Sequence, residues 1–121
     1  MQFLSMIWIH EKTIKPPTEK LMADMGKLME EMTKAGVLIG GEGVLPSATG
    51  AKVRFEGGQR TVVDGPFTEA KEVIAGFALI NAASKEEAIG HATRFAEIIG
   101  DTEVEIRQVA EFGDVDPAQR G

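Results

Sequence analysis

The chain has 121 residues, of which 43% are hydrophobic and 26% charged, as expected for one globular domain with a buried core. Its formal net charge of −6 argues against sequence-independent binding to nucleic acid, because such binding needs a basic surface. The absence of cysteine excludes disulfides, thiolate metal sites and a cysteine nucleophile. We expect a cytoplasmic protein, since the apolar run at residues 1–9 is too short to span a membrane and lacks the basic start of a signal peptide.

The first half of the chain predicts a strand, a helix and a second strand. Residues 3–9 are apolar at consecutive positions, which predicts a strand with two apolar faces. Thr18 is a suitable N-cap for the helix that follows, and Gly36 is suited to its C-terminal end. The apolar stripe of this helix has helical spacing and consists of Leu21, Met22, Met25, Leu28, Met29 and Met32. We interpret the methionines of this stripe as core rather than as the lining of a ligand pocket. Residues 37–41 predict the second strand.

The second half begins with a hairpin and repeats the strand, helix and strand order. Residues 52–56 and 60–63 flank a glycine turn and predict the hairpin. Residues 76–81 predict another strand with two apolar faces. A capping box of Ser84 and Glu87 begins a second helix, which ends at Gly100, and the alternation at residues 104–108 predicts the last strand.

This order predicts an α+β domain of ferredoxin-like βαββαβ type, with an inserted β-hairpin and with two helices on one face of an antiparallel sheet. We place the domain at residues 1–113 and a polar tail at 114–121. Two helices cover one sheet face only, although two of the strands are apolar on both. We therefore expect a homodimer joined through the open sheet face.

The run at residues 64–72 combines a turn with acidic, basic and aromatic side chains directly before an apolar strand. Asp64-Gly65-Pro66 cannot continue a strand or a helix, since Gly65 is free to take a positive φ and Pro66 fixes its own φ. Binding residues often lie on such a loop beside a sheet. The run therefore marks the candidate functional site.

This run, with its Asp64-Gly65-Pro66-Phe67 core and the Gly76-Phe77 strand, resembles the DGPF branch of the YCII-related proteins. Gly40-Gly41 and the Arg54 hairpin fit the same pattern. The resemblance covers residues 1–112 and implies a dimeric α+β barrel related to muconolactone-isomerase-like and EthD-like proteins. Members are largely uncharacterised, and some of their genes lie near sigma factors. In the shorter YCII branch a His–Asp pair is the proposed catalytic element. Asp64 is the matching acid here, but residues 18–35 contain no histidine for the first helix.

Asp64 and His10 are the two candidate catalytic residues. Asp64 could act as a general base or bind a ligand donor, although an Asx-turn that holds the bend is the more ordinary role. His10 ends the first strand and would titrate near neutral pH if Glu11 lies beside it. A lone histidine, here or at His91, is more often a surface or paired residue than a catalyst. No metal or cofactor is expected, because the histidine spacing of a metal site is absent.

The other candidate ligand-binding residues are Trp8, Arg54, Arg60, Phe67 and Glu69. Trp8 could line a pocket for a ring or fill the dimer interface. Arg54 and Arg60 could bind one carboxylate or phosphate together if they share a face of the hairpin. The interpretation as a solvated hairpin, with Arg54 and Glu56 on the same face, is slightly favoured. Glu69 and Glu72 would share a face of a short helix capped by Thr68, as paired carboxylates or, more simply, as solvated residues.

A second glycine-rich run, residues 40–43, could suggest a phosphate cradle. It lacks the Lys-Ser/Thr of a P-loop and the helix that follows one. Close approach of two backbones explains its glycines better.

Two kinds of function fit these residues. The first is a small apolar or aromatic metabolite bound in a cleft of the dimer, with acid–base chemistry of an isomerase or lyase type that uses Asp64. The alternative is a non-catalytic regulatory or protein-binding module, linked to transcription through the sigma-factor neighbourhood that the resemblance implies.

Overall fold

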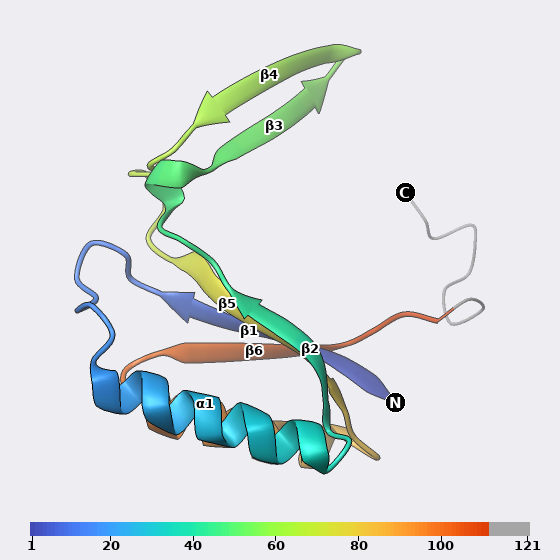
Figure 1. Ribbon diagram of the computed structural model, residues 1–121. Coiled ribbons are helices and arrows are strands. Elements are labelled where there is room, and N and C mark those ends of the chain that lie inside the picture. The colour runs from blue at the N-terminus through green and yellow to red at the C-terminus, as the bar shows by residue number, and fades with distance from the viewer. Residues whose placement is uncertain (112–121) are drawn as a thin grey trace.

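The computed structural model describes residues 1–111 and contains a four-stranded antiparallel sheet in the order β2-β5-β1-β6. Its elements are β1 (Gln2–Ile9), α1 (Glu19–Lys34), β2 (Leu38–Gly43), the 3₁₀ turn η1 (Ser47–Thr49), β3 (Ala51–Glu56), β4 (Gln59–Asp64), β5 (Val73–Asn81), α2 (Lys85–Ile99) and β6 (Glu103–Gln108). Both helices lie on one face of this sheet, while β3 and β4 form a separate hairpin on the other side (Figure 1). The predicted α+β, ferredoxin-like fold with its inserted hairpin is confirmed. The predicted tail at 114–121 lies outside the described residues.

The helix ends follow the local signals in the sequence. The Thr18 hydroxyl accepts a hydrogen bond from the Leu21 N–H at 3.1 Å, as expected of an N-cap. The Ser84 hydroxyl likewise accepts from the Glu87 N–H at 3.2 Å. The Glu87 carboxylate differs from a standard capping box, because it accepts from Ala83 N–H rather than from the N-cap residue. Both helices therefore begin where the sequence predicts.

The core fills the space between the two helices and one face of the sheet. Cross-strand pairing of Phe3 with Ile80 and of Ser5 with Ala78 places these buried residues on the helical face. The helices contribute the buried Leu28, Met32, Ala88 and Phe95 to the same cluster. The Ser5 hydroxyl is buried there without a hydrogen-bond partner among the described residues. Most of the methionine stripe is thus core, although Met22 is exposed.

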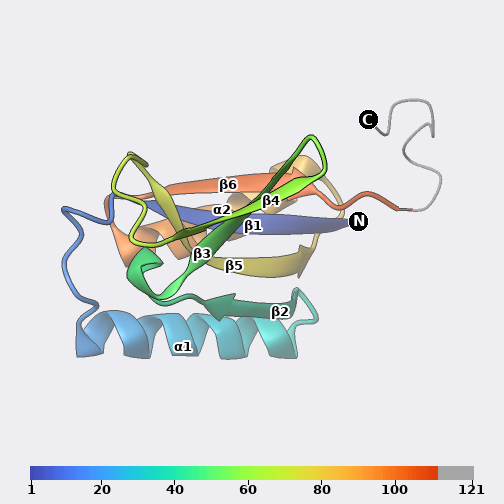
Figure 2. The ribbon, with the colours of Figure 1, turned by 90° about the horizontal axis from the view of Figure 1, so that it is seen from above.

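The opposite face of the sheet carries a second apolar layer, which we name the open face. It consists of Leu4, Met6, Trp8, Phe77 and Leu79. Leu4 pairs with Leu79 and Met6 with Phe77, one residue out of phase with the core pairs. Phe77 keeps 40% of its surface exposed. The predicted two-faced strands are therefore real, and no helix within residues 1–111 covers their second face (Figure 2).

Two predicted boundaries need correction. β5 begins at Val73 rather than at residue 76, so it starts directly after the Asp64 run. Gln59 belongs to β4 and pairs with Glu56, which leaves a two-residue turn of Gly57 and Gly58. Among residues 1–111, no helix is both long and apolar enough to cross a membrane.

Candidate functional site

Three loops meet at the end of the sheet where β1 ends and β5 begins, and Ser47 joins them. The Glu11 carboxylate, just after β1, accepts the Ser47 N–H at 2.8 Å and also accepts the Ser47 hydroxyl. The Ser47 oxygen in turn accepts the N–H of Phe67 at 3.1 Å. This chain of bonds links the loop after β1, the turn after β2 and the loop before β5.

The same place holds the root of the β3–β4 hairpin. The Gly65 N–H donates to the Gly50 carbonyl at 2.8 Å, which closes the two ends of the hairpin against each other. A Cβ at residue 65 would lie 1.7 Å from the Ser47 carbonyl oxygen, which is a severe steric clash, so only glycine fits at this position. Gly65 does not have a positive φ. The predicted reason for this glycine was therefore wrong, because it permits close packing rather than a left-handed turn.

Asp64 lies at the end of β4, opposite Ala51 in the hairpin, and it is exposed. Its carboxylate makes no hydrogen bond or ion pair within residues 1–111, so the predicted Asx-turn is not formed. The bend is held instead by the bond from Phe67 to Ser47. The Phe67 ring is half-buried and lies under the Lys52 ammonium, 4.5 Å from its centroid. The carboxylate of Asp64 is thus not used to hold the turn.

His10 is the histidine of this site, and its partner is Glu72. The ring Nε2 lies 3.3 Å from a Glu72 carboxylate oxygen, and Nδ1 lies 3.1 Å from the Lys71 carbonyl oxygen. Glu11, the neighbour that the sequence suggested, is occupied by Ser47. The His10 side chain remains 52% exposed. The structure thus brings His10 to a carboxylate 62 positions away, and not to Asp64.

Trp8 lies on the open face next to this pair in sequence. Its indole N–H donates to the Glu105 carboxylate on β6 at 3.1 Å, while its carbonyl accepts the Thr102 hydroxyl at 2.9 Å. These bonds fix the ring and the end of β1. An aromatic surface is thereby held in place beside an acidic group.

The remaining predicted residues do not gather at one point. Arg54 pairs with Thr61, and Arg60 pairs with Phe55, so the two guanidinium groups lie on opposite faces of the hairpin. A shared fork within one chain is therefore not formed, whereas Arg54 and Glu56 do share a face.

Residues 68–72 form a turn and not the predicted short helix, with Ala70 N–H donating to the Phe67 carbonyl. Glu69 is exposed on this turn. The predicted helical face shared by Glu69 and Glu72 does not exist.

The bonds from Ser47, first its hydroxyl and then its N–H, hold the pKa of the Glu11 carboxyl below its usual range. A carboxyl whose pKa is depressed by folding stabilises the protein above its unfolded pKa of about 4.3, and this contribution is lost as the pH falls through the folded value. We expect wild-type protein to be more stable than Glu11→Gln at neutral pH and the difference to shrink on acidification. Denaturant unfolding of both proteins between about pH 7 and pH 3 measures this difference. A difference that stays constant over the range would contradict the assignment.

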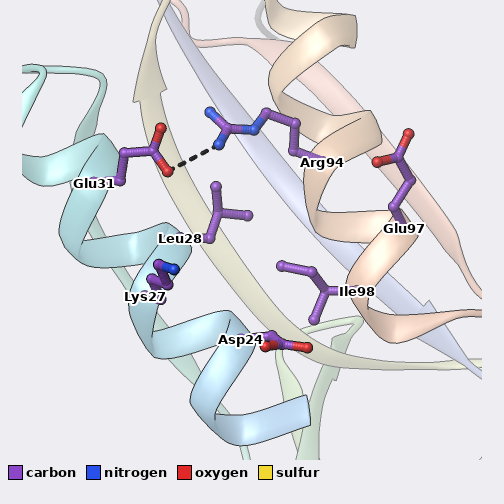
Figure 3. A pocket seen from close by; sticks show the side chains of 7 residues that line it. All are labelled: Asp24, Lys27, Leu28, Glu31, Arg94, Glu97 and Ile98. Atoms are coloured by element: carbon purple, nitrogen blue, oxygen red, sulfur yellow. Dashed lines mark hydrogen bonds and ion pairs between the residues drawn. The ribbon is translucent and has the colours of Figure 1, made fainter. Parts of the chain in front are cut away.

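Two hollows lie elsewhere on the domain. One, of about 270 Å³, lies between the helices and is lined by Asp24, Lys27, Leu28, Glu31, Arg94, Glu97 and Ile98 (Figure 3). Across it, Arg94 bonds to Glu31 at 3.0 Å. The other, of about 370 Å³, lies around Gly36, Asn81 and Glu87. Neither is lined by His10, Asp64 or Trp8, and within residues 1–111 no three metal-ligating side chains gather.

The fold and this site define a ferredoxin-like α+β domain with a bonded loop cluster at one end of its sheet and an apolar open face. The sequence profile of the YCII-related domain matches residues 1–113, and the chain belongs to that family. It is also similar to an uncharacterised protein of Rhizobium meliloti (strain 1021), with 36% identity over 78 residues. That match covers 64% of this chain and 63% of the relative.

Three contacts at the candidate site were absent from the sequence prediction: Glu11 with Ser47, His10 with Glu72, and Trp8 with Glu105. Each joins loops or strands that are distant along the chain. The one local signal was that Glu72 belongs to the Asp64 run, and it was assigned to the face of a short helix instead. Ser47 lay in a polar loop with no pattern to distinguish it.

Proposed function

We propose that this YCII-related protein, of the DGPF branch, is a cytoplasmic homodimer that binds a small apolar or aromatic metabolite. The ligand lies against the open face near Trp8, in a cleft completed by a second copy. His10 and Glu72 supply acid–base chemistry of an isomerase or lyase type.

The observation that supports this chemistry is the environment of the His10 ring. Nδ1 faces a carbonyl oxygen, which only accepts hydrogen bonds, so Nδ1 carries a proton. Nε2 faces the Glu72 carboxylate, so the two groups attract each other when a proton is shared between the ring nitrogen and the carboxylate oxygen. A pair that holds a proton at a half-exposed ring atom can deliver it to a ligand and take it back.

The binding surface suits a flat or apolar ligand. Trp8, Met6 and Phe77 are neighbours on the open face, since Met6 pairs with Phe77 and lies two residues before Trp8. Small-molecule sites commonly combine such an apolar surface with a few polar groups. Glu105, which is bonded to Trp8, and Glu103, which pairs with Trp8, are polar groups beside this surface, and His10 follows Trp8 by two residues.

Asp64 is the second candidate base. Its exposed carboxylate has no structural bond within residues 1–111, so it is available to a ligand or to a partner. Asp64→Asn therefore leaves the fold unchanged and tests this carboxylate directly.

The proposal is tested with a thermal-shift screen of aromatic acids, lactones and phosphorylated metabolites. A ligand found in this way is then incubated with the protein in D₂O, and NMR follows exchange of its carbon-bound protons next to a carbonyl. We expect wild-type protein to catalyse the exchange, and His10→Gln and Glu72→Gln to bind the ligand but exchange slowly.

The matched control is Asp64→Asn, which removes the other carboxylate. Exchange that is lost only in Asp64→Asn would transfer the base role from the His10–Glu72 pair to Asp64. Binding without exchange in wild-type protein would contradict the acid–base role and favour the non-catalytic, regulatory alternative.

A further inference from the structure

The β3–β4 hairpin, residues 51–64, is an arm that stands away from the domain. Every one of its residues is exposed, and its two strands pair only with each other. Val53 and Phe55 expose 65% and 67% of their surface. An isolated two-stranded hairpin is only marginally stable in water. The arm therefore requires a surface against which to pack.

The two faces of the arm differ in character. The register places Val53, Phe55 and Val62 on one face, together with Arg60, which pairs directly with Phe55, and with Asp64 at the root. Lys52, Arg54 and Glu56 lie on the other face, with Val63. The alternation of apolar and polar residues along β3 is typical of a strand with one buried face. The face with Phe55 is thus built for burial, although nothing in residues 1–111 buries it.

The arm is held away from its own sheet by its root. Both ends are joined by the bond from Gly65 to Gly50, and the Ser47 bonds fix them to the loop after β1. From this root the arm extends above the open face and crosses over β1 without joining the sheet (Figures 1 and 2). A rooted arm with a bare apolar face fits a second molecule better than its own domain.

The charges of the arm and of the open face indicate which second molecule packs against the arm. On its Phe55 face the arm carries one cation, Arg60, which forms no ion pair within residues 1–111. The open face carries three acids beside its apolar residues, Glu42 opposite Phe77, Glu105 opposite Met6 and Glu103 opposite Trp8, and one base, Arg107 opposite Leu4. An apolar arm face with Arg60 complements an apolar sheet face on which acids outnumber bases, and both surfaces belong to the same chain.

We propose that the arm of one copy packs its Phe55 face against the open face of a second copy, with Arg60 beside the acids of that sheet. Two-fold symmetry makes this contact twice in each dimer, since each copy offers one arm and one sheet. This inference rests on the proposed homodimer and adds that the arm is the element that clasps the partner.

The test is Phe55→Ser in the full chain, measured by sedimentation equilibrium. The side chain is exposed, so the monomer keeps its fold, which circular dichroism verifies. We expect the dimer dissociation constant to rise about tenfold or more, as for a buried aromatic interface residue. Thr61→Ser on the other face of the arm is the matched control and should leave the constant unchanged. Arg60→Glu should also weaken the dimer, and more so at low salt.

A cross-link identifies the partner surface. The chain has no cysteine, so Phe55→Cys carries a single benzophenone label. In mixed ¹⁴N and ¹⁵N protein we expect cross-links between unlike chains that end on the open face. Links within one chain, or a dimer unaffected by Phe55→Ser, would overturn the arm contact and leave the proposed dimer and ligand site standing. A monomeric wild-type protein at micromolar concentration would overturn the homodimer and the arm contact together.

Discussion

Gly65→Ala is expected to open the root of the arm and to lower the free energy of unfolding by about 2–3 kcal/mol. The new Cβ would lie 1.7 Å from the Ser47 carbonyl oxygen, and that atom belongs to the backbone, so it has no flexible side chain to move aside. Relief requires the loop of Phe67 to leave Ser47, which breaks the chain of bonds from Glu11. The damage should therefore concentrate at the loop cluster.

Denaturant unfolding gives the size of this loss, and amide hydrogen exchange gives its place. Faster exchange is expected at Gly65 and Phe67, whose N–H groups are bonded in the root. Gly50→Ala is the matched control, because its Cβ would meet the same Ser47 oxygen at 3.5 Å, an ordinary contact. Equal losses at Gly50 and Gly65 would contradict close packing as the reason for glycine at position 65.

The Asp64 run shows how far the sequence could predict this site. Its place beside a strand and its role as a bend are confirmed, because proline and glycine act locally. Its mechanism was wrong, because the atom that demands glycine belongs to Ser47, 18 positions earlier. A local sequence pattern indicates which backbone conformations a segment can adopt. A contact between two loops, in contrast, depends on the complete fold.

The same division holds for the fold as a whole. Caps such as Thr18 and Ser84 act within one turn, so the helices were predicted with their boundaries. The open face was also predicted, since an apolar residue on each side of a strand is visible in the sequence. The partner of His10 was not, because proximity in sequence favoured Glu11 and the fold delivers Glu72.

The glycine pair of β2 supports the second prediction with a large effect. Gly41 pairs with Ala78 of β5, and a Cβ there would lie 2.6 Å from the Phe77 carbonyl oxygen and 3.0 Å from the Ala78 Cα. We expect Gly41→Ala to push β2 away from β5 and to lower the free energy of unfolding by about 2–3 kcal/mol. Denaturant unfolding measures the loss, and hydrogen exchange should show faster opening along β2.

Gly40→Ala is a control from the adjacent position, since nothing lies within 4 Å of the Cβ it would add. It should be neutral or stabilise by about 0.5 kcal/mol, because alanine restricts the unfolded chain. Close backbone approach therefore does not explain Gly40, and the contrast between the two neighbours tests the prediction that it, and not a phosphate cradle, accounts for Gly41. A phosphate cradle would use the backbone freedom of both glycines. If phosphate protects wild-type protein against heat, and if both variants lose this protection equally, the explanation by close backbone approach is contradicted. Close approach makes Gly41 alone irreplaceable, and its cost should appear without any ligand.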